Sequence, residues 1–133
     1  MVAVIVYLSL SFICWELAAI CNAVMDTLKY HYYNSFFHKK FGDKNGFWNE
    51  DHKDAKPYII PYTKYKLNAW HLFKSSMIVL QALSSCFIFL AGTYIMVLPH
   101  KIIIIIGLLM VYGVKWNGFF NLFYNRLLVN KRV

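Results

Sequence analysis

Three long apolar stretches, separated by one polar segment and one short turn, dominate the hydrophobic pattern of this chain. The longest uninterrupted run extends from Met77 to Leu98, and the third stretch opens with five consecutive isoleucines after Lys101. A helix needs about 20 residues at 1.5 Å per residue to cross the hydrocarbon core of a bilayer, and each stretch provides them. The pattern therefore predicts three transmembrane helices, at about residues 2–41, 66–98 and 101–128.

Glycine, proline and a polar cap mark the ends of these helices. Gly42 can end the first helix because glycine readily adopts the left-handed conformation of a helix C-terminus. Asn68 can cap the second helix, and Pro99 follows it because proline cannot continue a helix interior. We expect residues 42–65 to form a basic, aromatic-rich interfacial loop. The predicted fold class is an all-α membrane protein with three transmembrane helices, organised as a single integral membrane domain over residues 1–133.

Composition supports a membrane location and suggests an orientation. The chain is 59% hydrophobic and 15% charged, whereas a soluble domain has about 45–50% apolar and about 25% charged residues. The net charge is +8, and most of the basic residues lie in the segment 38–66, which holds seven Lys, and near the C-terminus, whereas only Lys101 lies at the opposite side. This pattern favours the lipid bilayer and its anionic headgroups as partners, and no nucleic acid. The positive-inside rule places the N-terminus outside and the C-terminus in the cytoplasm, in a bacterial inner membrane.

Polar side chains interrupt all three spans, and the expected topology brings most of them to one depth near the cytoplasmic interface. At about 100° per residue, they fall on defined faces of their helices. We therefore expect one candidate polar site, formed by Asn22, Asp26, His31, His71, Lys74, Asn117 and Asn121.

Glu16 is the intramembrane charge that lies deepest in the first span. An ionisable side chain at the bilayer centre costs at least about 2.5 kcal/mol, and it is normally paired or faces a polar interior. Glu16 could be a proton or ion site, or a contact inside an oligomer. It could equally be a protonated carboxyl bonded across helices or one that snorkels outward.

Asp26 allows more than one kind of chemistry. With His71 or Lys74 it could form an ion pair that fixes helix packing. Because histidine titrates near pH 6.5 and aspartate near pH 3.9, it could also form an acid–base pair acting on a lipid headgroup. Asp26, His31 and His71 could in principle supply three metal ligands. The chain has no metal-binding motif, so we expect no metal and no cofactor.

Four short motifs carry a resemblance to a known group of proteins. They are Asn22-Ala23-Val24-Met25-Asp26 followed by His31, Phe47-Trp48-Asn49, Lys64-Tyr65-Lys66, and Ala69-Trp70-His71-Leu72. On these motifs the chain resembles small bacterial multi-span membrane proteins of unknown function. That group has a Trp shortly before the Lys-Tyr pair and an Asp before the Trp-His pair, where this chain has Tyr62-Thr63 and Asn68. The resemblance implies no activity, and it directs attention to Asn22, Asp26, His31, Trp70 and His71.

Two classes of function remain open. In the first, the protein is a non-enzymatic helix-bundle subunit of a membrane assembly, as a homo-oligomer or with a partner subunit, and pore formation is one form of this. The three-span plan with a basic tail is similar to that of the small phage holins, and glycines in the third span allow close helix contact. In the second, the protein is a membrane-embedded enzyme or a lipid- or metal-binding site that uses Asp26, His31, His71 and Lys74. The sequence favours the first class, because three helices enclose little volume for catalysis.

Overall fold

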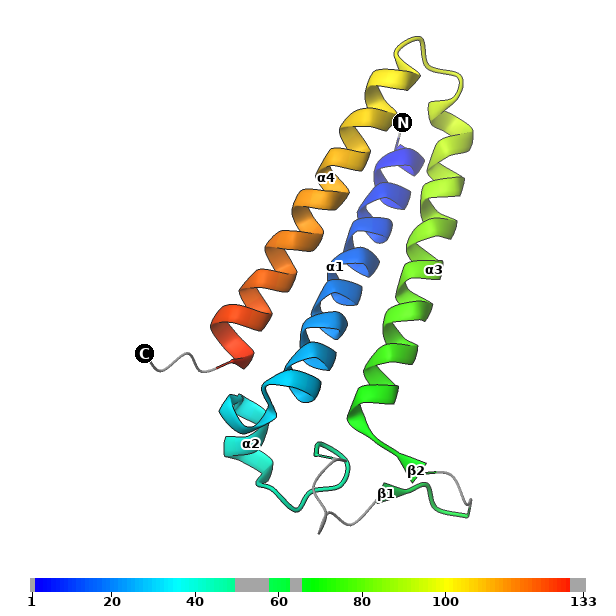
Figure 1. The fold of residues 1–133 in the computed structure, drawn as a ribbon. Helices are drawn as coiled ribbons and strands as arrows, with labels where there is room; N and C mark the ends of the chain where they lie inside the picture. Colours follow the sequence, from blue (N-terminus) through cyan, green and yellow to red (C-terminus); the bar gives the residue numbers. More distant parts are fainter. Residues whose placement is uncertain (1, 50–57, 63–65, 130–133) are drawn as a thin grey trace.

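The computed structural model describes residues 2–49, 58–62 and 66–129, and long helices make up most of this part of the chain. The long helices run side by side, with α1 between the other two (Figure 1). They are α1 (Val2–Tyr30), α3 (Ala69–Ile95) and α4 (Lys101–Leu122), and a turn of π-helix, Phe123–Leu128, continues α4. All three are long and apolar enough to cross a membrane. The prediction of an all-α protein with three candidate spanning helices is confirmed.

The short elements gather at one end of the molecule, opposite the N-terminus and the α3–α4 turn (Figure 1). They are a 3-10 turn η1 (Tyr32–Asn34), the helix α2 (Phe36–Phe41), and the strands β1 (Tyr58–Ile59) and β2 (Lys66–Leu67). The two strands pair antiparallel, and β2 is followed by α3 after the single residue Asn68. The remainder of the expected interfacial loop, residues 50–57 and 63–65, lies outside the described residues.

The first helix differs from the continuous helix over residues 2–41 that the sequence predicted. It ends at Tyr30, and a second helix starts only after Ser35. Ser35 is extended, with φ −107° and ψ 165°, and its hydroxyl oxygen accepts a hydrogen bond from the backbone N–H of His38. Serine in this role caps a new helix instead of continuing the old one. The chain therefore turns between α1 and α2.

The other helix ends lie close to their predicted positions. Asn68 caps α3 through a 2.8 Å bond from the N–H of His71 to its Oδ1, so the predicted cap is confirmed. The helix begins at residue 69 rather than 66 and ends at Ile95 rather than at residue 98. Gly42 ends α2 with φ 71°, the left-handed conformation that favours glycine.

Small residues on α1 allow its neighbours to approach closely. Ala18, Ala19 and Ala23 are completely buried, as is typical of contacts between membrane helices. The closest and most extensive packing joins α1 to α3. By contrast, Tyr112 is the single buried residue of α4, so α4 is attached to the bundle along a narrow strip.

A hydroxyl network formed by Ser11, Ser84 and Tyr112 joins all three long helices at one point. The hydroxyl of Ser11 donates to the carbonyl oxygen of Ser84 at 2.8 Å, and the hydroxyl of Ser84 donates to the carbonyl oxygen of Ser11 at 3.0 Å. The hydroxyl of Tyr112 donates to Ser11 Oγ. Both serines are completely buried, so the three hydroxyls satisfy one another where no water is available.

We predict that Ser84→Ala lowers the free energy of unfolding by about 1 kcal/mol, because interhelical hydrogen bonds in membranes contribute about 0.6 to 1.7 kcal/mol. The neighbouring Ser85→Ala is the matched control. The Ser85 hydroxyl is exposed and donates to Gln81 in its own helix, so we expect a change within about 0.5 kcal/mol. Unfolding in mixed detergent micelles measures both. Equal losses in the two variants would show that the network does not stabilise the bundle.

Candidate functional site

Glu16 is paired across helices, and its partner is Lys115 of α4. The Nζ of Lys115 donates to Glu16 Oε1. The Glu16 side chain is 19% exposed and that of Lys115 is 41% exposed, so the pair lies at the edge of the contact between α1 and α4. The Lys115 ammonium also lies over the ring of Phe12, 5.1 Å from its centroid. The carboxyl is thus bonded across helices, but to a lysine ammonium, whereas the interpretation from the sequence was a protonated carboxyl.

A tryptophan pair extends the same contact. The indole N–H of Trp15 donates to the carbonyl oxygen of Tyr112 at 3.0 Å, and its ring packs against Trp116 at 5.1 Å. Together with the hydroxyl network and the Glu16–Lys115 pair, these contacts form the polar seam that holds α4 to α1. The sequence analysis did not pair Lys115 with Glu16.

Asp26 and His31 lie beside the end of the third span. The carboxyl of Asp26 interacts electrostatically with Lys29 on its own helix and with Tyr124 of the π-helical turn. The His31 ring meets the Tyr124 ring edge-on, with 5.6 Å between the centroids. Tyr124 is therefore the residue that joins these two predicted site residues, although it was not itself predicted as one.

His71 and Lys74 lie on the first turns of α3, and both are exposed. The Nδ1 of His71 is 2.8 Å from Asn68 Oδ1, and the ammonium of Lys74 lies 4.8 Å from the centroid of the Trp70 ring. Both contacts are local to this end of α3. Among the described residues, neither side chain forms an ion pair with Asp26. The predicted pairing of Asp26 with His71 or Lys74 is thus not present in this structure.

The asparagines of the predicted site have different surroundings. Asn22 is half-buried on α1, and Asn121 accepts a 2.9 Å hydrogen bond from the Nδ2 of Asn125. Asn117 is exposed, and its side chain has no partner in the part of the chain that the structure describes. At about 100° per residue, Asn117 lies about 140° and Asn121 about 180° around α4 from the buried Tyr112. Both amides therefore face away from α1.

Metal ligands do not converge in the described ranges. Within residues 2–49, 58–62 and 66–129, no three His, Cys, Asp or Glu side chains lie close enough together to hold a metal ion. Asp26, His31 and His71 accordingly do not form the three-ligand set that the sequence allowed.

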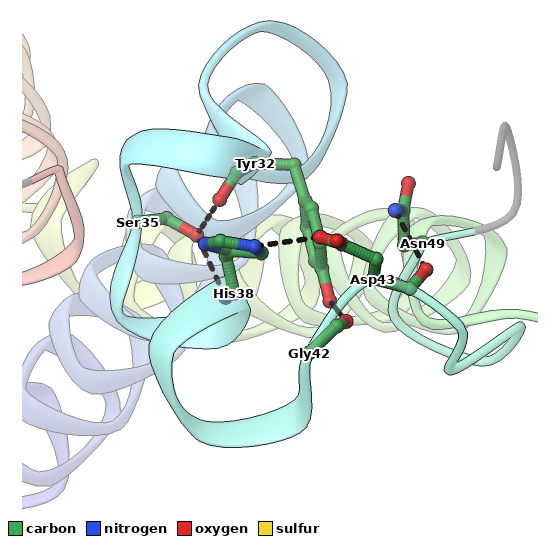
Figure 2. Close-up of polar contacts among 6 residues, drawn as sticks. All are labelled: Tyr32, Ser35, His38, Gly42, Asp43 and Asn49. Carbon is green, nitrogen blue, oxygen red and sulfur yellow. Dashed lines mark hydrogen bonds and ion pairs between the residues drawn. The ribbon is translucent and has the colours of Figure 1, made fainter.

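A second polar cluster lies outside the spans, in residues 32–49 (Figure 2). The hydroxyl of Tyr32 donates to the carbonyl oxygen of Gly42 at 2.6 Å, and His38 Nε2 lies 2.6 Å from Asp43 Oδ1. The Nδ2 of Asn49 donates to the carbonyl oxygen of Asp43 at 3.0 Å. These bonds fold the segment after α2 back onto α2.

Aromatic stacking attaches this segment to the bundle. The Trp48 ring is stacked on Phe37 at 4.8 Å and on Phe41 at 4.7 Å, and it also contacts Phe73 of α3 at 6.4 Å. Phe37 belongs to a small core with Val24 of α1. The cluster therefore attaches residues 42–49 to α2 and to the bundle, and we assign its hydrogen bonds a structural role.

Two of the hollows in the described part of the chain bear on its function. One is an apolar groove of about 790 Å³ between α3 and α4, with Trp15 of α1 among its lining residues. The other, about 620 Å³, lies between α2 and the chain around Arg126 and is lined mainly by polar groups.

Comparison of the chain with family models, with curated proteins and with solved structures found no match. Function is therefore argued from the geometry of the helices and of their polar groups.

The polar seam makes a prediction for the ion pair. We expect Lys115→Met to lower the free energy of unfolding by about 2 kcal/mol, because it leaves the Glu16 carboxyl without its partner in an apolar medium. The double variant Glu16→Leu/Lys115→Met removes both charges and should recover most of the loss. Unfolding of the four proteins in mixed micelles completes the cycle. A double variant as unstable as the sum of the two single variants would show that the charges do not interact.

Tyr32 makes a prediction for alkaline pH. Burial raises the pKa of its phenol above the usual value, and the nearby Asp43 and Tyr33 add to the shift. Because the folded-state pKa exceeds the unfolded one, this stabilisation is fully present below pH about 10 and is lost as the pH rises through the raised value. The absorbance of tyrosinate in the wild type minus that in Tyr32→Phe should show a component that titrates late. A component centred at or below the ordinary tyrosine pKa contradicts the assignment.

Proposed function

We propose that this protein is a non-enzymatic subunit of a membrane assembly and that it joins the assembly through the outward face of α4. The observation that carries the proposal is Asn117. Its amide is exposed on a helix apolar enough to cross a membrane, and it has no partner in the described part of the chain. An unpaired polar group in hydrocarbon costs several kcal/mol. A helix from another chain is the natural source of the missing hydrogen bond.

The residues around Asn117 support a helix-to-helix contact. All lie within about 60° of the direction opposite Tyr112. Together with the larger apolar residues Ile103, Ile106 and Met110, which meet the same criterion, they define the outward face of α4. Its small and polar members are Gly107, Asn117, Gly118 and Asn121, and Val114 lies among them. A Cβ added at Gly107 or Gly118 would meet no atom within 4 Å, so these glycines serve no close contact within the described chain. Small residues combined with amides are typical of interfaces between membrane helices.

The weak attachment of α4 points the same way. The most apolar stretch of each span is buried to a different extent. In the third span 6% of this stretch is buried inside the molecule, compared with 22% in the first span and 17% in the second. The apolar groove of about 790 Å³ also separates α4 from α3. Two of the three helices are thus partly covered by the bundle, whereas most of α4 is left for lipid or for another chain.

The composition of this side of α4 favours a sealed contact over a pore. The exposed side chains near the outward face include Ile103, Met110 and Val114, which are apolar and large. Two amides among them can pair across an interface, but they would line a water-filled channel poorly. We therefore propose assembly without a pore.

An enzyme or lipid site built from Asp26, His31, His71 and Lys74 is less well supported. Asp26 and His31 lie beside Tyr124, whereas His71 and Lys74 contact Asn68 and Trp70, respectively, at the start of α3. A catalytic pair needs its groups within hydrogen-bond reach of a common substrate.

Orientation follows from the basic residues. One end of the molecule contains α2 and the C-terminal end of α4 (Figure 1). The basic residues at this end include Lys39, Lys40, Lys44, Lys66 and Arg126, whereas the α3–α4 turn at the opposite end is followed by Lys101. The positive-inside rule supports a cytoplasmic position for the basic end.

We predict that Asn117→Leu weakens association by about tenfold, the equivalent of one interhelical hydrogen bond. Gly118→Leu should weaken it as well, because the added side chain prevents backbone approach while it meets nothing within the monomer. Cys86→Leu, at an exposed position of α3, is the control and should leave association unchanged. Self-association of the protein is measured by energy transfer between labelled copies in vesicles, over a range of protein-to-lipid ratios.

Two results would count against the proposal. One is a wild type that stays monomeric at every ratio and that also captures no second membrane protein through α4 when crosslinked in its native membrane. The other is loss of association in Cys86→Leu equal to that in Asn117→Leu, since the contact would then not lie on α4.

A further inference from the structure

We propose that the polar hollow between α2 and the end of the third span binds the phosphate of an anionic phospholipid. This basic hollow has a volume of about 620 Å³. The polar and charged side chains that line it include Asn34, His38, Lys39, Asn125 and Arg126. The hollow adjoins the outward face of α4, because its lining residue Asn125 donates a hydrogen bond to Asn121. Binding of a lipid phosphate there does not require the assembly proposed above.

The charges in the basic hollow are not neutralised from within. Lys39 and Arg126 are exposed, and neither has an ion-pair or cation–π partner in the described part of the chain. By contrast, Lys115 pairs with Glu16, and Lys74 lies over Trp70. No lining residue of the hollow is acidic. The carboxylate of Asp43 contacts a lining residue, with its Oδ1 2.6 Å from His38 Nε2. Lys39 and Arg126, which are far apart in the sequence, thus line one hollow in which no described acidic group neutralises their charges.

The fold fixes the two walls of the hollow relative to each other. Ser35 and Val129 form an antiparallel β-bridge between the start of α2 and the end of the π-helical turn. Both residues are buried, and Leu128 packs against the core that contains Tyr32 and Phe37. Backbone and core contacts hold the two walls together without a ligand. The backbone positions of Lys39 and Arg126 are therefore already set before a phosphate binds.

The position along the spans favours a lipid as the source of the phosphate. The hydrocarbon core is crossed by about 20 residues of helix, so a span that starts at Lys101 reaches headgroup level shortly before Arg126. Tyr33 and Phe36, on the opposite wall, are aromatic side chains of the kind that lie at this level. Arginine binds phosphate through a planar pair of N–H groups, and lysine adds a point charge.

The test compares lipid retention by the full chain in detergent micelles doped with phosphatidylglycerol or with phosphatidylcholine, read by native mass spectrometry. We expect the wild type to retain phosphatidylglycerol preferentially. Lys39→Gln and Arg126→Gln should each reduce its retention by about fivefold, the effect expected of one basic residue near an anionic surface. The double variant should lose the preference, and Arg126→Lys should keep part of it.

Lys66→Gln is the matched control, because Lys66 is an exposed cation at the same end of the molecule but does not line the hollow. A loss in Lys66→Gln equal to that in Arg126→Gln would mean general surface attraction and would overturn the proposal. Glycerol phosphate added in solution separates the two sources of phosphate. If it displaces the lipid at equal concentration, the hollow is a site for soluble phosphates and the lipid assignment is wrong. Circular dichroism of each variant confirms that the helices remain folded.

Discussion

The structure depends on one constraint, which is that a polar group within hydrocarbon must find its partner in protein. α1 meets this constraint by lying between the other helices. Its Ser11 reaches both Ser84 of α3 and Tyr112 of α4, and its Glu16 reaches Lys115. These contacts give the bundle a fixed order and rotation that apolar packing alone would leave loosely specified, since lipid tails are as apolar as the side chains they touch.

The same constraint separates the two sides of α4. The side toward α1 carries polar groups whose partners lie within the chain, including the hydroxyl of Tyr112 and the ammonium of Lys115. The opposite side carries Asn117, whose amide has none among the described residues. Under the proposed assembly, this second side of α4 is the boundary between this chain and another. The proposed assembly and the internal seam thus follow from a single rule.

The sequence predicted the extent of each candidate span along the chain better than the rotation of each helix about its axis. Length, hydropathy, Asn68 and Gly42 predicted the spans and several of their ends, because these signals are local. The pairing of Glu16 with Lys115 depends on how α1 and α4 are turned toward each other, and no spacing in the sequence encodes that. For the same reason, Asp26 was expected near His71 but lies near Tyr124. The interruption at Ser35 was missed because an aromatic-rich pattern continues through it.

The few contacts between α3 and α4 have a mechanical consequence. These helices are joined by a short turn at residues 96–100, and α4 is otherwise held by its strip of contact with α1 and by the end of the π-helical turn. Tilting α4 about that turn would therefore disturb less packing than any comparable movement of α3. Such a hinge motion belongs to the microsecond-to-millisecond range of collective movements. It would widen or close the apolar groove beside Trp15 and leave the packing of α1 against α3 intact.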